Sequence, residues 1–509
     1  STLQGESFYF HHGWHFLRAD AFPMAKAVDA HRDAEGHAFY EAGYRETGWQ
    51  PVTLPHTFND EDLFRDRIQD GGSGQRRTAA FYRNILTIPA RHTCYLYVNG
   101  TLAGYYEAGV APFGFDITPY VRYDAPNLIA IATDNTATRN APFCIAETPN
   151  KPDAVPGSYL FPQEQAVPAD RVGVPFFWNC NALHPSGITR PVQVFFKPDV
   201  YLTLPLYSNL QTKGLYVYGR NFDLDNATAD IRVEAEIRNE GKVPVSAQLR
   251  ITLRRPDGSV AAIFDGAPAT AAPTGRAVPP LSITPADAYI PDEAVPGHYC
   301  PVEDESLPAP TATDSMAVTV LHAGVDTLPL RFWSIDDPYL YTVEAELFVN
   351  GEKADTQQLT TGFRAVSYDK DRGLRINGAV QWLRGYAQRA ANEWAAIGIA
   401  PEWLHDEDAA LIRESNANHI RFMHVAGSPA DVRAFDRCGI VCTQPAGDKE
   451  KESFGRQWDQ RVELMRDVII AFRNHPSILF WEAGNNSISR EHMREMRLLK
   501  QLLDPHGGR

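Results

Sequence analysis

Short runs of alternating apolar and polar residues fill residues 1–198, and Gly, Pro, Asn and Asp separate them. The run 94–98 ends at Asn99 and Gly100, a pair that tolerates the positive φ angles of a two-residue hairpin turn. Helical periodicity is scarce in this part of the chain. The pattern therefore predicts an all-β domain over residues 1–198, either a sandwich or a jelly roll.

Period-two alternation continues over residues 199–364 and is clearest in 229–237 and 246–253. It predicts a second β domain, which we interpret as an immunoglobulin-like sandwich. Within it, the stretch 267–313 is rich in Pro, Ala and Asp. We interpret this stretch as an insertion or long loop, because compact domains seldom contain so long a connection.

After residue 365 helical periodicity alternates with short apolar runs, which predicts a parallel α/β domain over 365–509. About four strand–helix units fit there, which is half of a (β/α)₈ TIM barrel. The active sites of such barrels lie at the carboxyl ends of the strands. The predicted helices are 406–414, 430–438 and 457–472, and the predicted strands are 418–422, 439–442 and 477–481.

Composition restricts the classes of function. A chain of 509 residues exceeds one hydrophobic core, so several domains are expected. Its net charge of −15 argues against a nucleic-acid partner, which would require cationic groups to neutralise phosphates. No apolar run has the length of a membrane span. Six scattered cysteines form no zinc-binding pattern.

The strongest motif covers residues 472–486, which read FRNHPSILFWEAGNN. A helix end, a buried strand and trailing polar residues are predicted in that order. This run resembles the acid/base signature of glycoside hydrolase family 2, the β-galactosidase, β-glucuronidase and β-mannosidase family. The resemblance implies that Asn485 bonds the 2-hydroxyl of the sugar and assigns Trp481 to substrate binding.

The next position departs from the family, because Asn486 stands where the resemblance implies the glutamate that acts as general acid/base. A neutral amide cannot transfer a proton, and general acid–base catalysis contributes about 10²–10⁴-fold. Three interpretations remain open: an acid removed deliberately, an acid relocated in a divergent subfamily, or a protein that binds without catalysis. Glu482 is the nearest candidate for a relocated acid, and a substrate-bonding or supporting carboxylate is an equal alternative.

Two further motifs extend the resemblance. The strand that contains Arg421 and ends near His424 is similar to a family signature beside the catalytic pocket. Arg384 and Gly385 match the first barrel strand, so the resemblance assigns Arg384 to substrate binding, although the pocket residues that usually follow are changed. The loop after it offers Asn392, Glu393 and Trp394 for hydroxyl bonding, acid catalysis or stacking on a sugar; packing within the loop is the alternative.

Weaker matches cover the rest of the chain. The segments around Trp333 and Arg364 are similar to those that close the family's immunoglobulin-like domain. Four short motifs from Trp49 to Thr118 follow the order of its sugar-binding jelly roll. The resemblance thus runs from about residue 49 to residue 509.

The resemblance implies an exo-acting, retaining β-glycosidase that uses two carboxyl groups, with the nucleophile beyond residue 509. We expect a β-galactosidase acting on oligosaccharides from a complex polysaccharide, in a bacterial periplasm or outside the cell. The alternatives are a β-glucuronidase or another family 2 glycosidase and, in a different class, a non-catalytic carbohydrate-binding protein. No cofactor is expected; a Mg²⁺ or Na⁺ ion occurs in some relatives, but no ligand cluster identifies one here. A homo-oligomer is compatible with the sequence.

Overall fold

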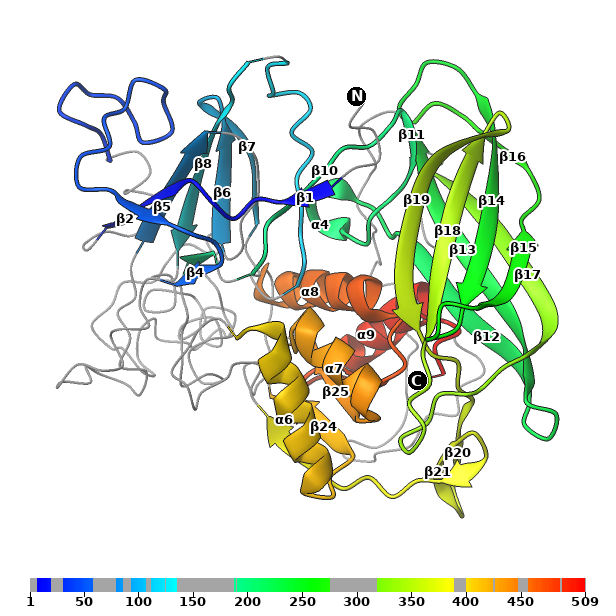
Figure 1. Cartoon of the computed structure of the whole chain (residues 1–509). Helices are drawn as coiled ribbons and strands as arrows, with labels where there is room; N and C mark the ends of the chain where they lie inside the picture. The colour runs from blue at the N-terminus through cyan, green and yellow to red at the C-terminus, as the bar shows by residue number, and fades with distance from the viewer. Residues whose placement is uncertain are drawn as a thin grey trace.

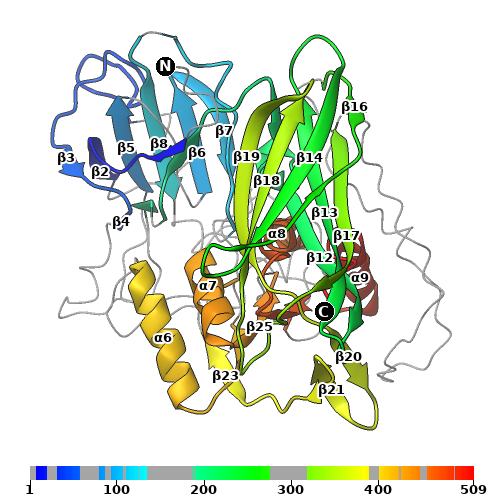
Figure 2. The same cartoon turned by 45° about the vertical axis from the view of Figure 1, so that its right-hand side comes forward.

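The structure is a computed structural model with two β regions and an α/β region (Figure 1). Both views place the α/β region beneath the two β regions (Figures 1 and 2). No helix among the described residues is long and apolar enough to cross a membrane. The described residues are 7–19, 31–57, 79–85, 93–106, 111–123, 125–134, 187–188, 190–274, 318–388, 400–423, 426–446, 456–485 and 488–508.

The N-terminal region is built on a six-stranded antiparallel sheet in the order β3-β2-β5-β8-β6-β7. Asn99 and Gly100 have φ angles of 52° and 87° and form the predicted hairpin between β6 and β7. Two short pairs, β1 with β10 and β4 with β9, belong to the same region. The strands are β1 (Ser7–Tyr9), β2 (Trp14–Ala19), β3 (Gln50–Val52), β4 (His56–Thr57), β5 (Ala79–Ile85), β6 (Thr93–Val98), β7 (Thr101–Tyr106), β8 (Leu128–Asp134), β9 (Gly187–Ile188) and β10 (Gln193–Phe195).

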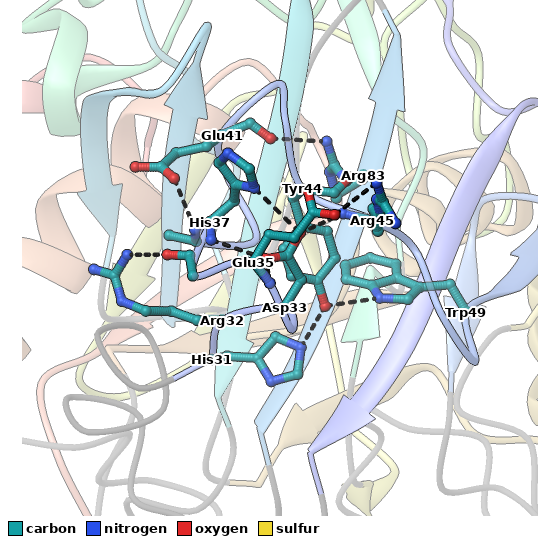
Figure 3. A network of polar contacts seen from close by, with 12 residues as sticks. His31, Arg32, Asp33, Glu35, His37, Glu41, Tyr44, Arg45, Trp49 and Arg83 are labelled. Carbon is teal, nitrogen blue, oxygen red and sulfur yellow. Dashed lines mark hydrogen bonds and ion pairs between the residues drawn. The ribbon is translucent and has the colours of Figure 1, made fainter.

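Residues 31–49 form a segment that packs against this sheet, with Phe39 against Phe81 of β5. Arg83, also on β5, donates hydrogen bonds to backbone carbonyls of this segment. Its guanidinium lies 5.1 Å from the centroid of the Tyr44 ring and donates to the Tyr44 carbonyl (Figure 3). The segment therefore buries its aromatic side chains against this face of the sheet.

Asp33 closes the same segment on itself. Its carboxylate accepts hydrogen bonds from the backbone N–H groups of Glu35, His37 and Arg45. Desolvation alone would raise the pKa of this carboxyl, but the three amide bonds and the His37 side chain lower it to about 2. Asp33 is thus ionised throughout the neutral range and fixes the turn.

The second region is a sandwich of two antiparallel sheets that share one hydrophobic core. The predicted strands at 229–237 and 246–253 are confirmed as parts of β13 and β14. One sheet contains β11 (Val200–Leu202), β12 (Leu215–Asp223), β13 (Thr228–Asn239) and β17 (Thr319–Pro329). The other contains β14 (Val245–Arg254), β15 (Val260–Asp265), β16 (Ala269–Ala271), β18 (Tyr341–Val349) and β19 (Glu352–Thr361).

The interpretation of 267–313 as a loop is wrong at its beginning. Residues Ala269–Ala271 form β16 and pair with β14, with Ala271 opposite Val245. The small side chain of Ala271 is fully buried in the sandwich core, so an alanine-rich stretch here serves packing. Residues 275–317 lie outside the described residues.

The α/β region confirms the predicted alternation of strands and helices. A small antiparallel sheet of β20 (Val366–Asp369), β21 (Gly373–Ile376) and β22 (Ala379–Val380) precedes it. Four parallel strands follow in the order of the chain: β23 (Gly385–Gln388), β24 (His419–Phe422), β25 (Val441–Pro445) and β26 (Ile478–Glu482). The helices are α6 (Glu402–Glu414), α7 (Pro429–Cys438), α8 (Arg456–Phe472) and α9 (Arg490–Leu503); α4 (Tyr207–Leu210) is a single turn before β12. These four strands form an open sheet, and the described residues contain no closed barrel.

Helix α7 shows why the sequence folds locally as it does. The Ser428 hydroxyl accepts from the Asp431 backbone N–H, and the Asp431 carboxylate accepts from the Ser428 backbone N–H. This capping box satisfies two N–H groups that the first turn leaves without helical partners. At the other end, Gly439 takes φ of 69° and ends the helix directly before β25.

The turn before β26 joins the α/β region to the sandwich. The Asn474 amide donates to the Leu215 carbonyl and accepts from the Val217 backbone N–H, at 3.0 and 2.8 Å. The Arg364 guanidinium donates to the Pro476 carbonyl at 2.6 Å. Asn474 and Pro476 belong to the motif that resembles an acid/base signature. Here they connect two regions at the amino end of the strand.

Candidate active site

The two faces of the parallel sheet differ in what covers them. On one face the side chains of Ile420, Phe422, Cys442 and Ile478 are fully buried and share a core with residues of α6, α7 and α8. Register places Arg421 opposite Thr443, and Thr443 opposite Phe480, on the other face. Side chains alternate between faces along a regular strand, and a register shift in β26 between Ile478 and Phe480 brings Phe480 to the face that carries Thr443. The second face therefore carries Arg421, Thr443, Phe480 and Glu482, and it corresponds to the interior of a barrel.

A polar cluster forms where β24 and β26 end. The Arg421 guanidinium donates to both oxygens of Glu482, each at 2.6 Å. The same side chain donates to the amide oxygen of Asn485 at 2.9 Å. The Glu482 side chain is 13% exposed and that of Arg421 is 30% exposed. The structure thus brings together three of the predicted site residues at the carboxyl edge, where barrel active sites lie.

This arrangement constrains the chemistry of Glu482. Both carboxylate oxygens accept hydrogen bonds from a guanidinium that can only donate. This pairing favours an orienting role for Glu482 over the delivery of a proton. The planar Arg421 fork fixes the orientation of the carboxylate, because a bidentate pair has two directions defined at once. The cluster is suited to orient a bound polar group.

His419 lies one layer below the cluster, on the same face of the sheet. Its Nε2 is 3.0 Å from the Thr443 hydroxyl, and its ring meets Phe480 edge-on. Burial lowers the pKa of His419, so the imidazole is neutral at neutral pH. His419 and Thr443 were not among the predicted site residues. The available signal was the spacing, because His419 stands two residues before Arg421 in the same strand and so shares its face.

Arg384 lies at the opposite end of the sheet from the cluster. It directly precedes β23, and its guanidinium donates to the Asn416 carbonyl at 2.8 Å, ahead of β24. The side chain of Asn418 accepts from the Arg384 backbone N–H. The structure thus places Arg384 away from the cluster, where it bonds the amino ends of the first two strands, and its role in substrate binding stays a prediction.

Trp481 lies on the helix-covered face, opposite its neighbour Glu482. Its indole N–H donates to the Asp504 carboxylate at 2.9 Å, and its ring packs with buried side chains of α8 and α9. The prediction that Trp481 binds substrate does not fit this position. Alternation along β26 already placed residues 481 and 482 on different faces, so the signal was present in the sequence.

Five other predicted residues lie outside the described residues and stay predictions: His424, Asn486, Asn392, Glu393 and Trp394. The chain places Asn486 directly after Asn485, and His424 three residues after Arg421. Within the described part of the chain, no group of three or more His, Cys, Asp and Glu side chains is arranged to hold a metal ion.

Two family models match the chain, one over the part that contains this site and one over the segment that precedes it. The model of the glycosyl hydrolases family 2 TIM barrel domain matches residues 369–506, which contain the parallel sheet and the cluster. A second model, described as glycosyl hydrolases family 2, matches residues 302–364. The two matches together cover the end of the sandwich and the whole α/β region.

Individual relatives extend the match to the N-terminal region. A β-glucuronidase of Formosa agariphila is 30% identical over 489 residues, which cover 92% of this chain and 42% of that protein. The β-galactosidase BoGH2A of Bacteroides ovatus is 21% identical, over 88% of this chain and 44% of that protein. A solved β-glucuronidase of family 2 superposes with a TM-score of 0.73 at 27% identity, over 99% of this chain and 45% of its own. This chain spans less than half the length of these relatives, and it belongs to glycoside hydrolase family 2.

Proposed function

We propose that the protein containing this chain is a retaining, exo-acting β-glycosidase that hydrolyses a terminal β-glucuronide. The observation that carries the proposal is the Arg421–Glu482–Asn485 cluster at the carboxyl edge of a family 2 barrel sheet. A rigid set of donors and acceptors at that edge suits a sugar ring with several hydroxyl groups.

The choice of glucuronide rests on the relatives. The Formosa β-glucuronidase aligns with 92% of this chain at 30% identity, and the family 2 β-glucuronidase structure superposes over 99% of it. The β-galactosidase BoGH2A aligns at 21% identity. The expectation of a β-galactosidase from sequence is not confirmed. A galactoside therefore becomes the second sugar to test.

The proton for the leaving group comes from a carboxyl other than Glu482 in this proposal. Glu482 has both oxygens on Arg421, and Asn486 has an amide that cannot donate a proton to an alkoxide as an acid does. Glu393 follows the first parallel strand, so the sequence assigns it to the carboxyl edge of the sheet. We assign the acid role to Glu393 and the attack on the anomeric carbon to a nucleophile outside this chain.

A panel of nitrophenyl glycosides tests the sugar. Full-length protein is assayed with the β-glucuronide, β-galactoside and β-mannoside, and kcat/KM is compared. The proposal expects the β-glucuronide to exceed the others by at least about tenfold, the gain of one good polar contact. Preference for the β-galactoside would overturn the choice of sugar.

Substrates with different leaving groups identify the residue that acts as the general acid. Loss of a general acid slows substrates with poor leaving groups most, because an activated phenol departs without a proton. Glu393→Gln should lower kcat/KM on the phenyl β-glucuronide by about 10²–10⁴-fold and on the dinitrophenyl β-glucuronide far less, because kcat/KM reports the step in which the leaving group departs. Glu482→Gln should lower kcat/KM for both substrates by the same factor, because it disturbs binding of the sugar that the two substrates share. The reverse pattern would assign the acid to Glu482.

Binding without catalysis is the second candidate, and Asn486 is the observation that favours it. Here the full-length protein binds glucuronide oligosaccharides in calorimetry but releases no reducing sugar. Asn486→Glu separates the two candidates. A large gain of hydrolysis in this variant supports a protein that has lost its acid, and no gain supports an acid elsewhere in an active enzyme.

A further inference from the structure

Asp504, which ends helix α9, is fully buried and accepts two hydrogen bonds from different regions. One oxygen accepts from the indole N–H of Trp481 on β26 at 2.9 Å. The other accepts from the hydroxyl of Tyr216 on β12 of the sandwich at 2.8 Å. The carboxylate therefore bridges a sandwich strand and the residue directly before Glu482.

Tyr216 is itself fixed from several directions. It is 2% exposed, and its hydroxyl accepts from the His506 backbone N–H at 2.9 Å. The Arg473 guanidinium lies 4.5 Å from the centroid of its ring and donates to the carbonyls of Leu503 and Lys213. This cation also lies close enough to Asp504 for its charge to act on the carboxylate. The hydrogen bonds from Tyr216 and Trp481 to Asp504 are thus buried, and the loss of one of them would lower the free energy of unfolding.

We propose that Asp504 and Tyr216 are positioning residues for the polar cluster, an inference that rests on the proposed function. They hold Trp481 on the helix-covered face of β26, and the alternation of the strand then directs Glu482 toward Arg421 on the other face. Asn474 fixes the amino end of the same strand against β12. Strand β12 therefore bonds the turn that precedes β26 and, through Asp504, also reaches Trp481 near the carboxyl end of β26.

Tyr216→Phe tests the inference, because it removes one hydroxyl and keeps the ring and the bond between Asp504 and Trp481. The matched control is Tyr218→Phe. Tyr218 lies on the same strand, but its hydroxyl donates to Glu234 within the sandwich at 2.9 Å. Both variants are made in the full-length protein, and amide hydrogen exchange is measured at residues 482–485.

Tyr216→Phe should raise the exchange rate at 482–485 by at least about tenfold, and Tyr218→Phe should leave it unchanged. On an aryl β-glucuronide, Tyr216→Phe should lower kcat by about tenfold with KM within twofold, while Tyr218→Phe keeps both constants. Equal exchange in the two variants, or equal kcat, would overturn the positioning role. If the wild type hydrolyses no glycoside the proposed function fails, and the exchange result alone then decides this inference.

Discussion

The two ends of strand β26 differ in what their polar residues do. At the amino end, Asn474 and His475 bond the sandwich and Asp436 of α7. At the carboxyl end, Glu482 and Asn485 bond Arg421 on the interior face of the sheet. Both sets fall within one continuous sequence motif. A family signature can therefore combine residues that join parts of the fold with residues that form the site.

The same contrast separates the two arginines of the first barrel strands. Arg384 donates to a backbone carbonyl at the amino end, and Arg421 donates to a carboxylate and an amide near the carboxyl end. Position along the strand, more than residue type, decides which arginine can meet a substrate.

The largest effect is expected at Arg421. Arg421→Met leaves the mostly buried Glu482 carboxylate without its cation and releases Asn485. We expect kcat/KM on an aryl β-glucuronide to fall by at least about 100-fold, equivalent to about 2.7 kcal/mol. Arg421→Lys keeps the charge and loses the bidentate fork, so it should lie between wild type and Arg421→Met. An unchanged kcat/KM in the methionine variant would remove the cluster from the site.

Asn474→Ala should affect stability more than activity. The Val217 N–H and the Leu215 carbonyl would both lose their partner. We expect the free energy of unfolding to fall by about 2 kcal/mol, measured from the urea midpoint. Asn226→Ala is the control, since its exposed amide bonds only Asp223 in the sandwich. If Asn226→Ala lowers the free energy of unfolding as much as Asn474→Ala does, the contacts of Asn474 do not join the α/β region to the sandwich.

Arg384→Gln tests whether the arginine at the amino end of the sheet contacts substrate. Its guanidinium is exposed and bonds the Asn416 carbonyl, so the loss of stability should stay within about 1 kcal/mol. Substrate constants should not change, because the side chain lies at the amino end of the sheet. A rise in KM with a normal unfolding midpoint would return Arg384 to the substrate site.

The smallest effect is a pH dependence in the segment 31–49. The pKa of Asp33 is lowered to about 2, so its contribution to stability is present above the usual aspartate pKa and is lost as pH falls through about 2. The difference in thermal midpoint between wild type and Asp33→Ala should be constant from neutral pH to about 4 and then shrink. A difference that grows in acid would contradict the assigned hydrogen bonds.

Much of the α/β region could be predicted because its periodicity is strong. The predicted helix 457–472 begins one residue after the start of α8, and the predicted strand 477–481 is shifted by one residue from β26. Arg421, Glu482 and Asn485 were predicted as separate site residues. Their pairing could not be predicted, because it depends on the register across β25, which lies between the two strands.

Two predicted site residues lie away from the cluster, for physical reasons that the residues themselves show. Trp481 was assigned by its place in a motif, although alternation along the strand separates it from Glu482. Arg384 was assigned by the same reasoning, although β23 begins only at the next residue. The bridge through Asp504 was not predictable, because it joins Tyr216 to a residue 288 positions later in the chain.

A crystal structure of the full-length Glu393→Gln variant with an aryl β-glucuronide would show whether the Arg421–Glu482–Asn485 cluster contacts the sugar. We expect the sugar to bind at the carboxyl edge of the sheet, with a hydroxyl or carboxylate oxygen within about 3.2 Å of Asn485 or Arg421. A sugar bound beside Arg384 at the amino edge, or with no polar atom in reach of the cluster, would contradict it.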